Sequence, residues 1–279
     1  MIISVASGKG GTGKTTVATN MATALGTSVQ LLDCDVEEPN AHLFLNPEIV
    51  STQEVHTMIP EIDTEKCIAC GQCAAICRFS AITMVARTVL TFPELCHGCG
   101  GCVEVCPTGA VAEGQRELGV VELGRARDVA FGHGKMRIGE AMAPPLIGKV
   151  RDHAQTDGLV IIDAPPGTSC PVIAAMQDTD FIVLVTEPTP FGLHDLKLAV
   201  GAIKLLKIPC GLVINRSDLG TDEVRRYALA EGIPILLEIP FDRAIAEAYS
   251  QGRMLVDVVP EWRKEFIGMY QNIKTLAEC

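Results

Sequence analysis

The feature that most limits how this chain can fold is a glycine-rich stretch at residues 8–16, with the sequence GKGGTGKTT. An apolar run precedes it and apolar residues at helical spacing follow it, so the local context is strand, loop and helix. This is the context that the G-x-x-x-x-G-K-T pattern of a phosphate-binding loop requires; the alternative is an ordinary glycine-rich turn. In such a loop, backbone N–H groups surround phosphate oxygens, and the dipole of the following helix points at the same anion.

We therefore expect a nucleotide site at this loop. Lys14 is expected to contact the β- and γ-phosphates, and the Thr15 hydroxyl to bind Mg²⁺. The other residues expected around the phosphates are Gly8, Gly10, Gly11, Thr12, Gly13 and Thr16.

Lys9 directly follows the first glycine and gives the variant pattern K-G-G-T-G-K-T-T. This pattern resembles the deviant Walker A ATPases, the group of MinD, ParA, Mrp and the nitrogenase iron protein. The resemblance implies ATP hydrolysis in a homodimer that holds the nucleotides between its subunits. It also implies that Lys9 reaches the partner's phosphates and stabilises charge on the transferred phosphoryl group, as an arginine finger does. The alternative is a loop lysine that neutralises its own phosphates.

Two other segments complete the expected catalytic site. A near-continuous apolar run at residues 158–162 predicts a buried parallel strand that ends in Asp163. Asp163 occupies the Walker B position, which holds a Mg²⁺-bound water. Gly167 can offer its N–H to the γ-phosphate, so this segment is expected to sense ATP versus ADP. The D-x-P-P-G-T motif resembles the Mrp branch of the family. By the same resemblance, Asp35 of the D-x-D motif orients the attacking water and Asp33 supports it; the alternative is an Asp pair that starts a turn.

Base recognition is expected after the strand at residues 211–215. Asn215 and Arg216 stand where the family reads adenine with an amide and stacks an arginine. The sequence N-R-S-D also resembles the N-K-x-D element of GTPases, in which Asp218 would accept from guanine. The remaining pattern favours ATP over GTP.

Eight cysteines form two groups with identical spacing, C-x₂-C-x₂-C-x₃-C, offset by 29 residues. An internal duplication explains the offset, and the spacing resembles that of bacterial two-cluster ferredoxins. In that pattern the fourth cysteine of each group ligates the other 4Fe–4S cluster. One cluster is then expected on Cys67, Cys70, Cys73 and Cys106, and the other on Cys77, Cys96, Cys99 and Cys102. Structural zinc is the alternative, although it does not explain the repeated third and fourth cysteines.

These motifs predict the fold class and the domain organisation. Alternating strands and helices with ligands at the carboxyl ends of strands predict an α/β fold, a doubly wound, mostly parallel sheet of the P-loop NTPase type. The resemblance implies an inserted small α+β ferredoxin-type domain at residues 61–115, which divides the ATPase domain into residues 1–60 and 116–279. Residues 46–60, with Pro47 and Pro60, are expected to form a linker.

Composition limits the partners. The net charge of −11 and the 4% aromatic content argue against nucleic acid as a main partner. No apolar run reaches membrane-spanning length and no signal peptide is recognised, so we expect a cytoplasmic protein without a membrane partner. The amphipathic segment at residues 262–276 is expected to pack on the core rather than on a membrane.

Three roles are compatible with the sequence. The first is ATP-gated electron transfer to a redox partner protein, as resemblance to the nitrogenase iron protein implies. The second is delivery of Fe–S clusters to an apo-acceptor, as resemblance to Mrp-type carriers implies, and the third is a positioning switch with structural clusters. Cys170 lies shortly after Gly167, and a third cluster bridging two subunits there is a further hypothesis, with a buried apolar role as the default.

Overall fold

The computed structural model describes residues 1–278, which form two compact units. The larger unit comprises Met1–Thr52, Val121–Lys135 and the chain from Ile147 onward. The second, here called the cysteine-rich unit, comprises Gln53–Val120 and Met136–Leu146. Two long strands, β3 (Glu48–Ile62) and β6 (Val111–Ala126), have residues in both units.

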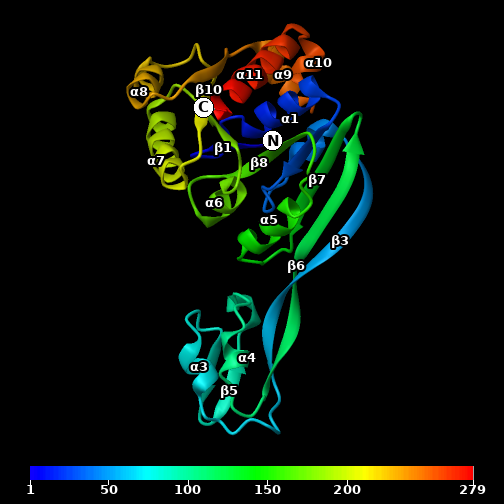
Figure 1. Cartoon of the computed structure of the whole chain (residues 1–279), viewed down its shortest axis with the longest axis vertical. Coiled ribbons are helices and arrows are strands. Elements are labelled where there is room, and N and C mark those ends of the chain that lie inside the picture. Colours follow the sequence, from blue (N-terminus) through cyan, green and yellow to red (C-terminus); the bar gives the residue numbers. More distant parts are fainter. Residues whose placement is uncertain (279) are drawn as a thin grey trace. The chain divides into compact units, whose positions relative to one another are not determined.

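The larger unit is built on a mostly parallel sheet, as predicted (Figure 1). The strand order is β11-β10-β9-β1-β8-β2-β7-β6-β3, and every printed pairing from β11 to β7 is parallel. The remaining strands of this sheet are β1 (Ile2–Ser7), β2 (Val29–Asp33), β7 (Val129–Met136), β8 (Leu159–Pro166), β9 (Phe181–Thr186), β10 (Cys210–Asn215) and β11 (Ile235–Ile239). The expected strands at residues 158–162, 181–186 and 211–215 are therefore confirmed.

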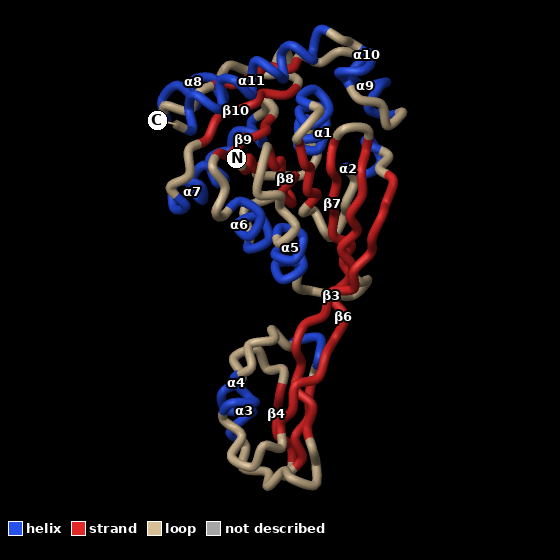
Figure 2. Tube along the Cα trace, turned by 45° about the vertical axis from the view of Figure 1, so that its right-hand side comes forward, coloured by secondary structure: helices blue, strands red, loops and turns tan. Residues whose placement is uncertain are grey.

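Helices cover both faces of this sheet (Figure 2). They are α1 (Lys14–Leu25), α2 (Ala41–Leu45), α5 (Ala143–Arg151), α6 (Cys170–Met176), α7 (Pro190–Leu206), α8 (Glu223–Glu231), α9 (Arg243–Ser250), α10 (Leu255–Val258) and α11 (Glu261–Ala277). Alternate residues of the central strand β1 face opposite sides. Ile3 and Val5 join the core under α1 and α11, whereas the Ser4 hydroxyl donates to the Ala175 carbonyl of α6.

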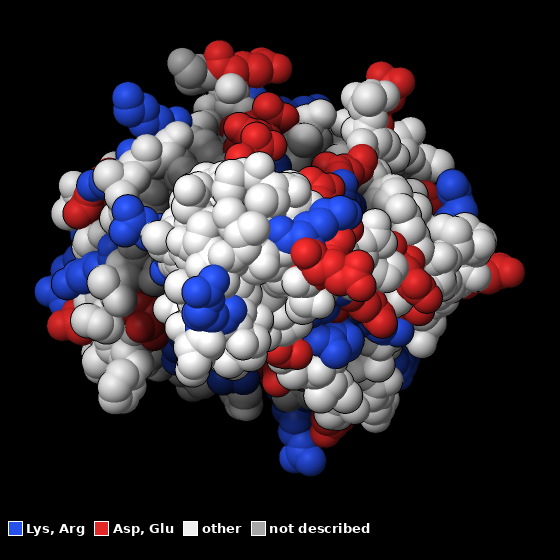
Figure 3. Space-filling model, turned by 90° about the horizontal axis from the view of Figure 1, so that it is seen from below, with Lys and Arg blue, Asp and Glu red and all other residues white. Residues whose placement is uncertain are grey.

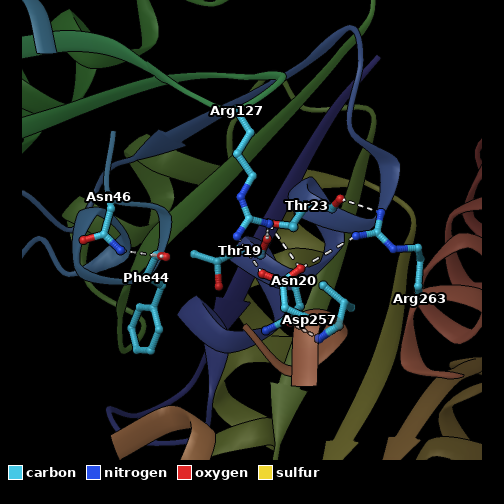
Figure 4. Close-up of polar contacts among 9 residues, drawn as sticks. Thr19, Asn20, Thr23, Phe44, Asn46, Arg127, Asp257 and Arg263 are labelled. Atoms are coloured by element: carbon cyan, nitrogen blue, oxygen red, sulfur yellow. Dashed lines mark hydrogen bonds and ion pairs between the residues drawn. The ribbon is translucent and has the colours of Figure 1, made fainter. Parts of the chain in front are cut away.

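The C-terminal helix packs on the core, as predicted. Its residues Phe266, Met269 and Ile273 are fully buried in the cluster that includes α1. Polar contacts also hold this region together: the Arg263 guanidinium donates to the carbonyls of Thr23 and Ala24 at the end of α1 (Figure 4). These carbonyls are among those that helix geometry leaves without an internal partner, so Arg263 stabilises the end of α1.

The cysteine-rich unit repeats one short motif. Helices α3 (Gln72–Ile76) and α4 (Gly101–Glu104) each follow a glycine with positive φ, 77° at Gly71 and 73° at Gly100. The hairpin of β4 (Ile82–Val85) and β5 (Thr88–Thr91) and the short helix η1 (Pro93–Leu95) lie between them in sequence. Buried Cys73 and Cys102 pack with Ile82 and Val111 in one small core.

The interpretation of residues 46–60 as a linker is wrong, because most of them belong to β3. Pro47 precedes the strand, and Pro60 lies near its end. Proline is tolerated at those places because β3 is at the edge of the sheet, where one side of the backbone needs no ladder partner.

The cysteine-rich unit exposes large apolar side chains at Ile68, Ile76, Phe79, Met84, Val85, Leu90, Phe92 and Leu95. On the face shown in Figure 3, uncharged residues form a broad area between separate basic and acidic groups. Within residues 1–278, no helix is both long and apolar enough to cross a membrane.

Candidate nucleotide site and cysteine pockets

The glycine-rich loop lies between β1 and α1, and Lys14 is the first residue of that helix. The φ of Gly13 is 96°, and a Cβ atom there would come within 2.5 Å of Asn215 Nδ2. The same amide donates to the Thr12 carbonyl at 2.9 Å. Gly8 is equally constrained, because a Cβ atom would lie 2.2 Å from a backbone oxygen of α7. Both glycines therefore permit close backbone approach that a larger residue would prevent.

The remaining loop residues differ in exposure. Gly10 and Gly11 are exposed, Thr15 and Thr16 are partly buried, and Lys14 is only 7% exposed. The buried Thr12 hydroxyl has no hydrogen-bond partner among the described residues.

Asp163 lies in the C-terminal half of β8, which continues to Pro166 instead of ending at Asp163 as predicted. It is in register with Asp33 of β2 and with Val5 of β1. Its carboxylate is buried, and neither oxygen makes a hydrogen bond of normal geometry within residues 1–278. Burial raises its pKa, whereas the Lys14 ammonium and the Thr15 side chain lower it. Buried carboxylate oxygens are normally paired or bound to metal, so Asp163 and Thr15 fit the expected Mg²⁺.

Asp33 shapes the loop that carries Asp35. Its Oδ1 accepts from the N–H of Asp35, and its Oδ2 accepts from the N–H groups of Asn40 and Ala41, each at 3.0 Å. Asp33 thus stabilises both the position of Asp35 and the start of α2. Burial raises the pKa of Asp35 to about 6, although Lys14 acts in the opposite direction.

Gly167 follows β8 with a φ of 102°. Its N–H donates to the Ser7 carbonyl at 3.0 Å. In this conformation the Gly167 N–H is therefore hydrogen-bonded to β1. This hydrogen bond to the Ser7 carbonyl has to break before the N–H can donate to a phosphate.

Glu187 is a site residue that the sequence analysis missed. It directly follows β9, and its carboxylate lies 3.8 Å from Lys9 Nζ and 2.9 Å from Arg216 Nη1. An acidic residue at the carboxyl end of a parallel strand was the available signal. Within one chain, the Lys9 ammonium and the Arg216 guanidinium therefore both lie next to the Glu187 carboxylate.

A cavity of about 350 Å³ lies beside the loop, and Arg216 and Asn215 line it. Apolar walls come from Phe241, Ile245 and Tyr249. This combination of a few polar groups with aromatic and apolar walls is typical of a small-molecule site. The two residues expected to read the base are thus next to the loop, although the Asn215 amide also supports Thr12.

The eight cysteines line two separate pockets in the cysteine-rich unit. Cys67, Cys70, Cys73 and Cys106 line the first, and Cys77, Cys96, Cys99 and Cys102 line the second. Each pocket thus combines three cysteines of one repeat with the fourth cysteine of the other, the grouping that the sequence predicts. Within residues 1–278, no three or more Cys, His, Asp or Glu side chains form a site for a single metal ion.

The surroundings of the sulfurs fit thiolate ligands. The pKa of Cys77 is lowered because backbone N–H groups from Phe79 to Ile82 outweigh its partial burial. Backbone N–H groups, that of Thr108 foremost, also lower the pKa of Cys106. Burial raises the pKa of Cys73 and Cys102. Because cluster ligation requires thiolates, the N–H groups around both fourth cysteines favour that role.

Cys170 is the first residue of α6 and is exposed. The default expectation of a buried, apolar role for this residue is therefore wrong.

Comparison with known proteins places this geometry in a family. A model described as the CobQ/CobB/MinD/ParA nucleotide binding domain matches residues 3–256. An uncharacterized protein of Methanocaldococcus jannaschii is 29% identical over 98% of this chain and 96% of its own length. The iron-sulfur cluster carrier protein of Aquifex aeolicus is 26% identical over 99% of this chain and 68% of its own length.

Among solved structures, the septum site-determining protein MinD from Pyrococcus horikoshii, complexed with Mg-ADP, has a similar fold. The TM-score is 0.61 at 23% identity, over 99% of this chain and 96% of that one. The match of the family model over most of the sequence, on a fold with a phosphate-binding loop and acidic strand ends, shows that this chain belongs to the CobQ/CobB/MinD/ParA nucleotide binding domain family.

Proposed function

We propose that this protein is an ATP-dependent dimeric switch whose nucleotide state controls a resident pair of 4Fe–4S clusters used for electron transfer. The observation that carries the proposal is the lining of two pockets by the eight cysteines, each pocket with four, in a chain of a nucleotide-binding family. Such clusters would supply one-electron transfer at low potential.

The nucleotide residues have separate tasks in this proposal. Lys14 and the loop N–H groups bind the phosphates, and Thr15 and Asp163 hold Mg²⁺, which neutralises charge on the phosphates. Asp35 orients the attacking water, and Lys9 acts on the nucleotide of the partner subunit. For this, the Lys9 ammonium has to move from the Glu187 carboxylate to a phosphate of the partner's nucleotide. The Gly167 N–H also has to break its hydrogen bond to the Ser7 carbonyl. Both exchanges make the loops sensitive to the γ-phosphate.

The chain path supports coupling between the two functions. Helix α2, whose first N–H is held by Asp33, is followed after two residues by β3. Toward its other end, β3 contributes Met58 and Pro60 to the pocket of the second cysteine set. A shift of the loop after Asp33 can therefore be passed along one continuous strand to that pocket.

Cluster delivery is the second candidate, because the relative in Aquifex aeolicus is named an iron-sulfur cluster carrier protein. Burial favours resident clusters, because each set has at least one ligand, Cys73 in the first and Cys96 and Cys102 in the second, that is only 8% exposed. One ligand of each set, Cys70 and Cys99, is exposed. Delivery would require the buried ligands to become accessible to the acceptor as well.

Two measurements separate these roles. Anaerobically purified protein is expected to hold roughly eight iron atoms per chain, in two 4Fe–4S clusters. Incubation with an apo-acceptor and ATP should leave this iron on the protein, whereas a one-electron acceptor should reoxidise the dithionite-reduced form. Transfer of the iron to the apo-acceptor would favour the carrier, and zinc or an absence of metal would contradict both roles.

A further inference from the structure

Two aromatic rings are stacked at the pocket of the second cysteine set. This set consists of Cys77, Cys96, Cys99 and Cys102. The rings belong to Phe79 and His97, which line the same pocket as the four cysteines. Their centroids are 3.6 Å apart, and their planes differ by only 11°. The rings are therefore in direct contact beside the expected ligands.

This stack joins two separate segments of the chain. Phe79 comes two residues after Cys77, the fourth cysteine of the first repeat. His97 directly follows Cys96, the first cysteine of the second repeat. The second set takes its ligands from both segments, so Cys77 has to be held next to the segment that begins at Cys96. The contact between the two rings does this.

The loop after the other fourth cysteine, Cys106, has residues that suit a tight turn. Pro107 has a fixed φ, and Gly109 has a φ of 62°, a left-handed conformation that glycine adopts freely. The Thr108 hydroxyl also lies 3.8 Å from Cys106 Sγ. The position of Cys106 is therefore favoured by the sequence of its own loop.

The loop after Cys77 lacks these residues. The 29-residue repeat places Arg78, Phe79 and Ser80 where proline, threonine and glycine follow Cys106. Ser80 has a φ of 57°, so the backbone keeps the left-handed conformation in a residue that adopts it less readily. This loop therefore gains more from a stabilising contact outside itself.

The first cysteine set has no equivalent of the ring pair. Ile68 stands at the position that corresponds to His97, and Thr108 at the position that corresponds to Phe79. Two aromatic rings therefore occur only in the copy whose loop has neither the proline nor the glycine.

We propose that the stack of Phe79 on His97 positions Cys77 as a ligand of the cluster on the second set, in place of the turn-forming residues that position Cys106 for the other cluster. Both rings are positioning residues, and neither is a ligand. Phe79 is 40% exposed, so the contact lies near the surface of the cysteine-rich unit. This inference rests on the proposed function, since it requires a cluster on each set.

The test measures how fast each cluster loses iron. Anaerobic protein is incubated with dithionite and an excess of a ferrous-iron chelator, and the absorbance of the chelate records the release. In Phe79→Ala, half of the iron should be released about 3- to 10-fold faster than in the wild type, the effect expected of one aromatic pair. The other half should be released at the wild-type rate.

Phe92→Ala is the matched control. Phe92 is 43% exposed, close to the 40% of Phe79, and it lines neither cysteine pocket. Its replacement should leave the release of all the iron unchanged.

Variants of His97 separate stacking from the chemistry of the imidazole. His97→Ala should accelerate the same half of the iron as Phe79→Ala. His97→Phe keeps two stacked rings without an imidazole and should release iron at the wild-type rate. Phe79→Ala combined with His97→Ala should be no faster than either single variant, because both substitutions remove one contact.

Arg78→Pro tests why the second loop needs the stack. Cys77 has a ψ of 109°, the extended conformation that suits a residue before proline. Arg78→Pro combined with Phe79→Ala should therefore slow the fast half of the iron toward the wild-type rate. Because Arg78 directly follows Cys77, this rescue also assigns the fast half to the second set.

The outcomes are distinguishable. Wild-type release in Phe79→Ala, equal acceleration of all the iron, or His97→Phe as fast as His97→Ala would each overturn the inference. So would a Phe79→Ala protein that Arg78→Pro does not slow. If Phe79→Ala fails to fold, His97→Ala makes the same test from the other ring. A wild-type protein without clusters contradicts the proposed function itself, and this is seen in its iron and sulfide content before any variant is made.

Discussion

The Nζ atom of Lys9 lies 3.8 Å from the carboxylate of Glu187 in the same chain. If Lys9 acts on the nucleotide of a partner subunit, this contact has to break when the dimer forms. The pair is partly solvated, since the Lys9 side chain is 33% exposed, so its rupture costs only about 0.2–1 kcal/mol.

Glu187→Gln should therefore make dimer formation easier. The ATP concentration that gives half-maximal dimer is expected to fall by up to about fivefold, because the released energy is at most about 1 kcal/mol. Light scattering over a series of ATP concentrations measures the fraction of dimer and so gives this midpoint. Glu231→Gln, which removes the exposed ion pair with Lys204, is the matched control and should change nothing. A higher ATP requirement in Glu187→Gln would count against release of Lys9.

Lys14→Ala should weaken nucleotide binding by about 10- to 100-fold, since a charge-assisted hydrogen bond contributes about 1.5–3 kcal/mol. Calorimetry with ADP checks the affinity. The visible spectrum should still show both clusters, because Lys14 and the cysteines belong to different compact units. Lys9→Ala is the companion variant: it should bind nucleotide within the monomer and lose hydrolysis in the dimer. Loss of the cluster spectrum in Lys14→Ala would contradict the separation of the two functions.

Asp163→Asn should remove the effect of Mg²⁺ on nucleotide affinity. The buried, unpaired carboxylate of Asp163 is the group that fits the ion, and its neutral amide is a poor substitute. We expect Mg²⁺ to strengthen ATP binding about tenfold or more in the wild type, and not at all in the variant. Titrations with and without a chelator measure this difference, and an undiminished Mg²⁺ effect would place the ion elsewhere.

A buried histidine predicts a pH dependence of stability. His133 of β7 is 1% exposed and lies 2.7 Å from Glu122. Burial lowers its pKa below 6.5, and the hydrogen bond that its Nε2 makes to the Glu122 carboxylate opposes this only in part. The unfolded chain then binds more protons between the folded pKa and 6.5, so the free energy of unfolding falls as the pH is lowered through this window.

His133→Asn should flatten this dependence. Urea unfolding at a series of pH values near and below about 6.5 gives the slope for each protein. His194→Asn, at an exposed position of α7, is the control and should keep the wild-type slope. Equal slopes for wild type and His133→Asn would show that His133 does not titrate differently in the folded state.

Local motifs made much of this protein predictable. The strand, loop and helix around Lys14 follow from glycine, lysine and apolar spacing within one short segment. The grouping of cysteines in two pockets follows from a repeated spacing. The strand β3 was predictable in principle, because Ile49, Val50 and Val55 are β-branched, but Pro47 just before it and Pro60 near its end indicated a linker.

Contacts between distant residues were not predictable. Glu187 faces Lys9 only because β9 and β1 are neighbours in the sheet, and no local pattern records that pairing. Similarly, Arg116 of β6 pairs with Glu140 because the segment that follows β7 folds back to β6. Residues at carboxyl ends of parallel strands are brought together by topology, which a single sequence specifies only indirectly.

The measurement that tests the central claim most directly is the anaerobic reduction potential of the bound clusters in the presence of ATP and then of ADP. Coupling between the two functions predicts a shift of tens of millivolts, where about 59 mV is a tenfold change for one electron, and predicts no shift in Lys14→Ala. Identical potentials with both nucleotides, in protein that binds both and carries intact clusters, would contradict the claim.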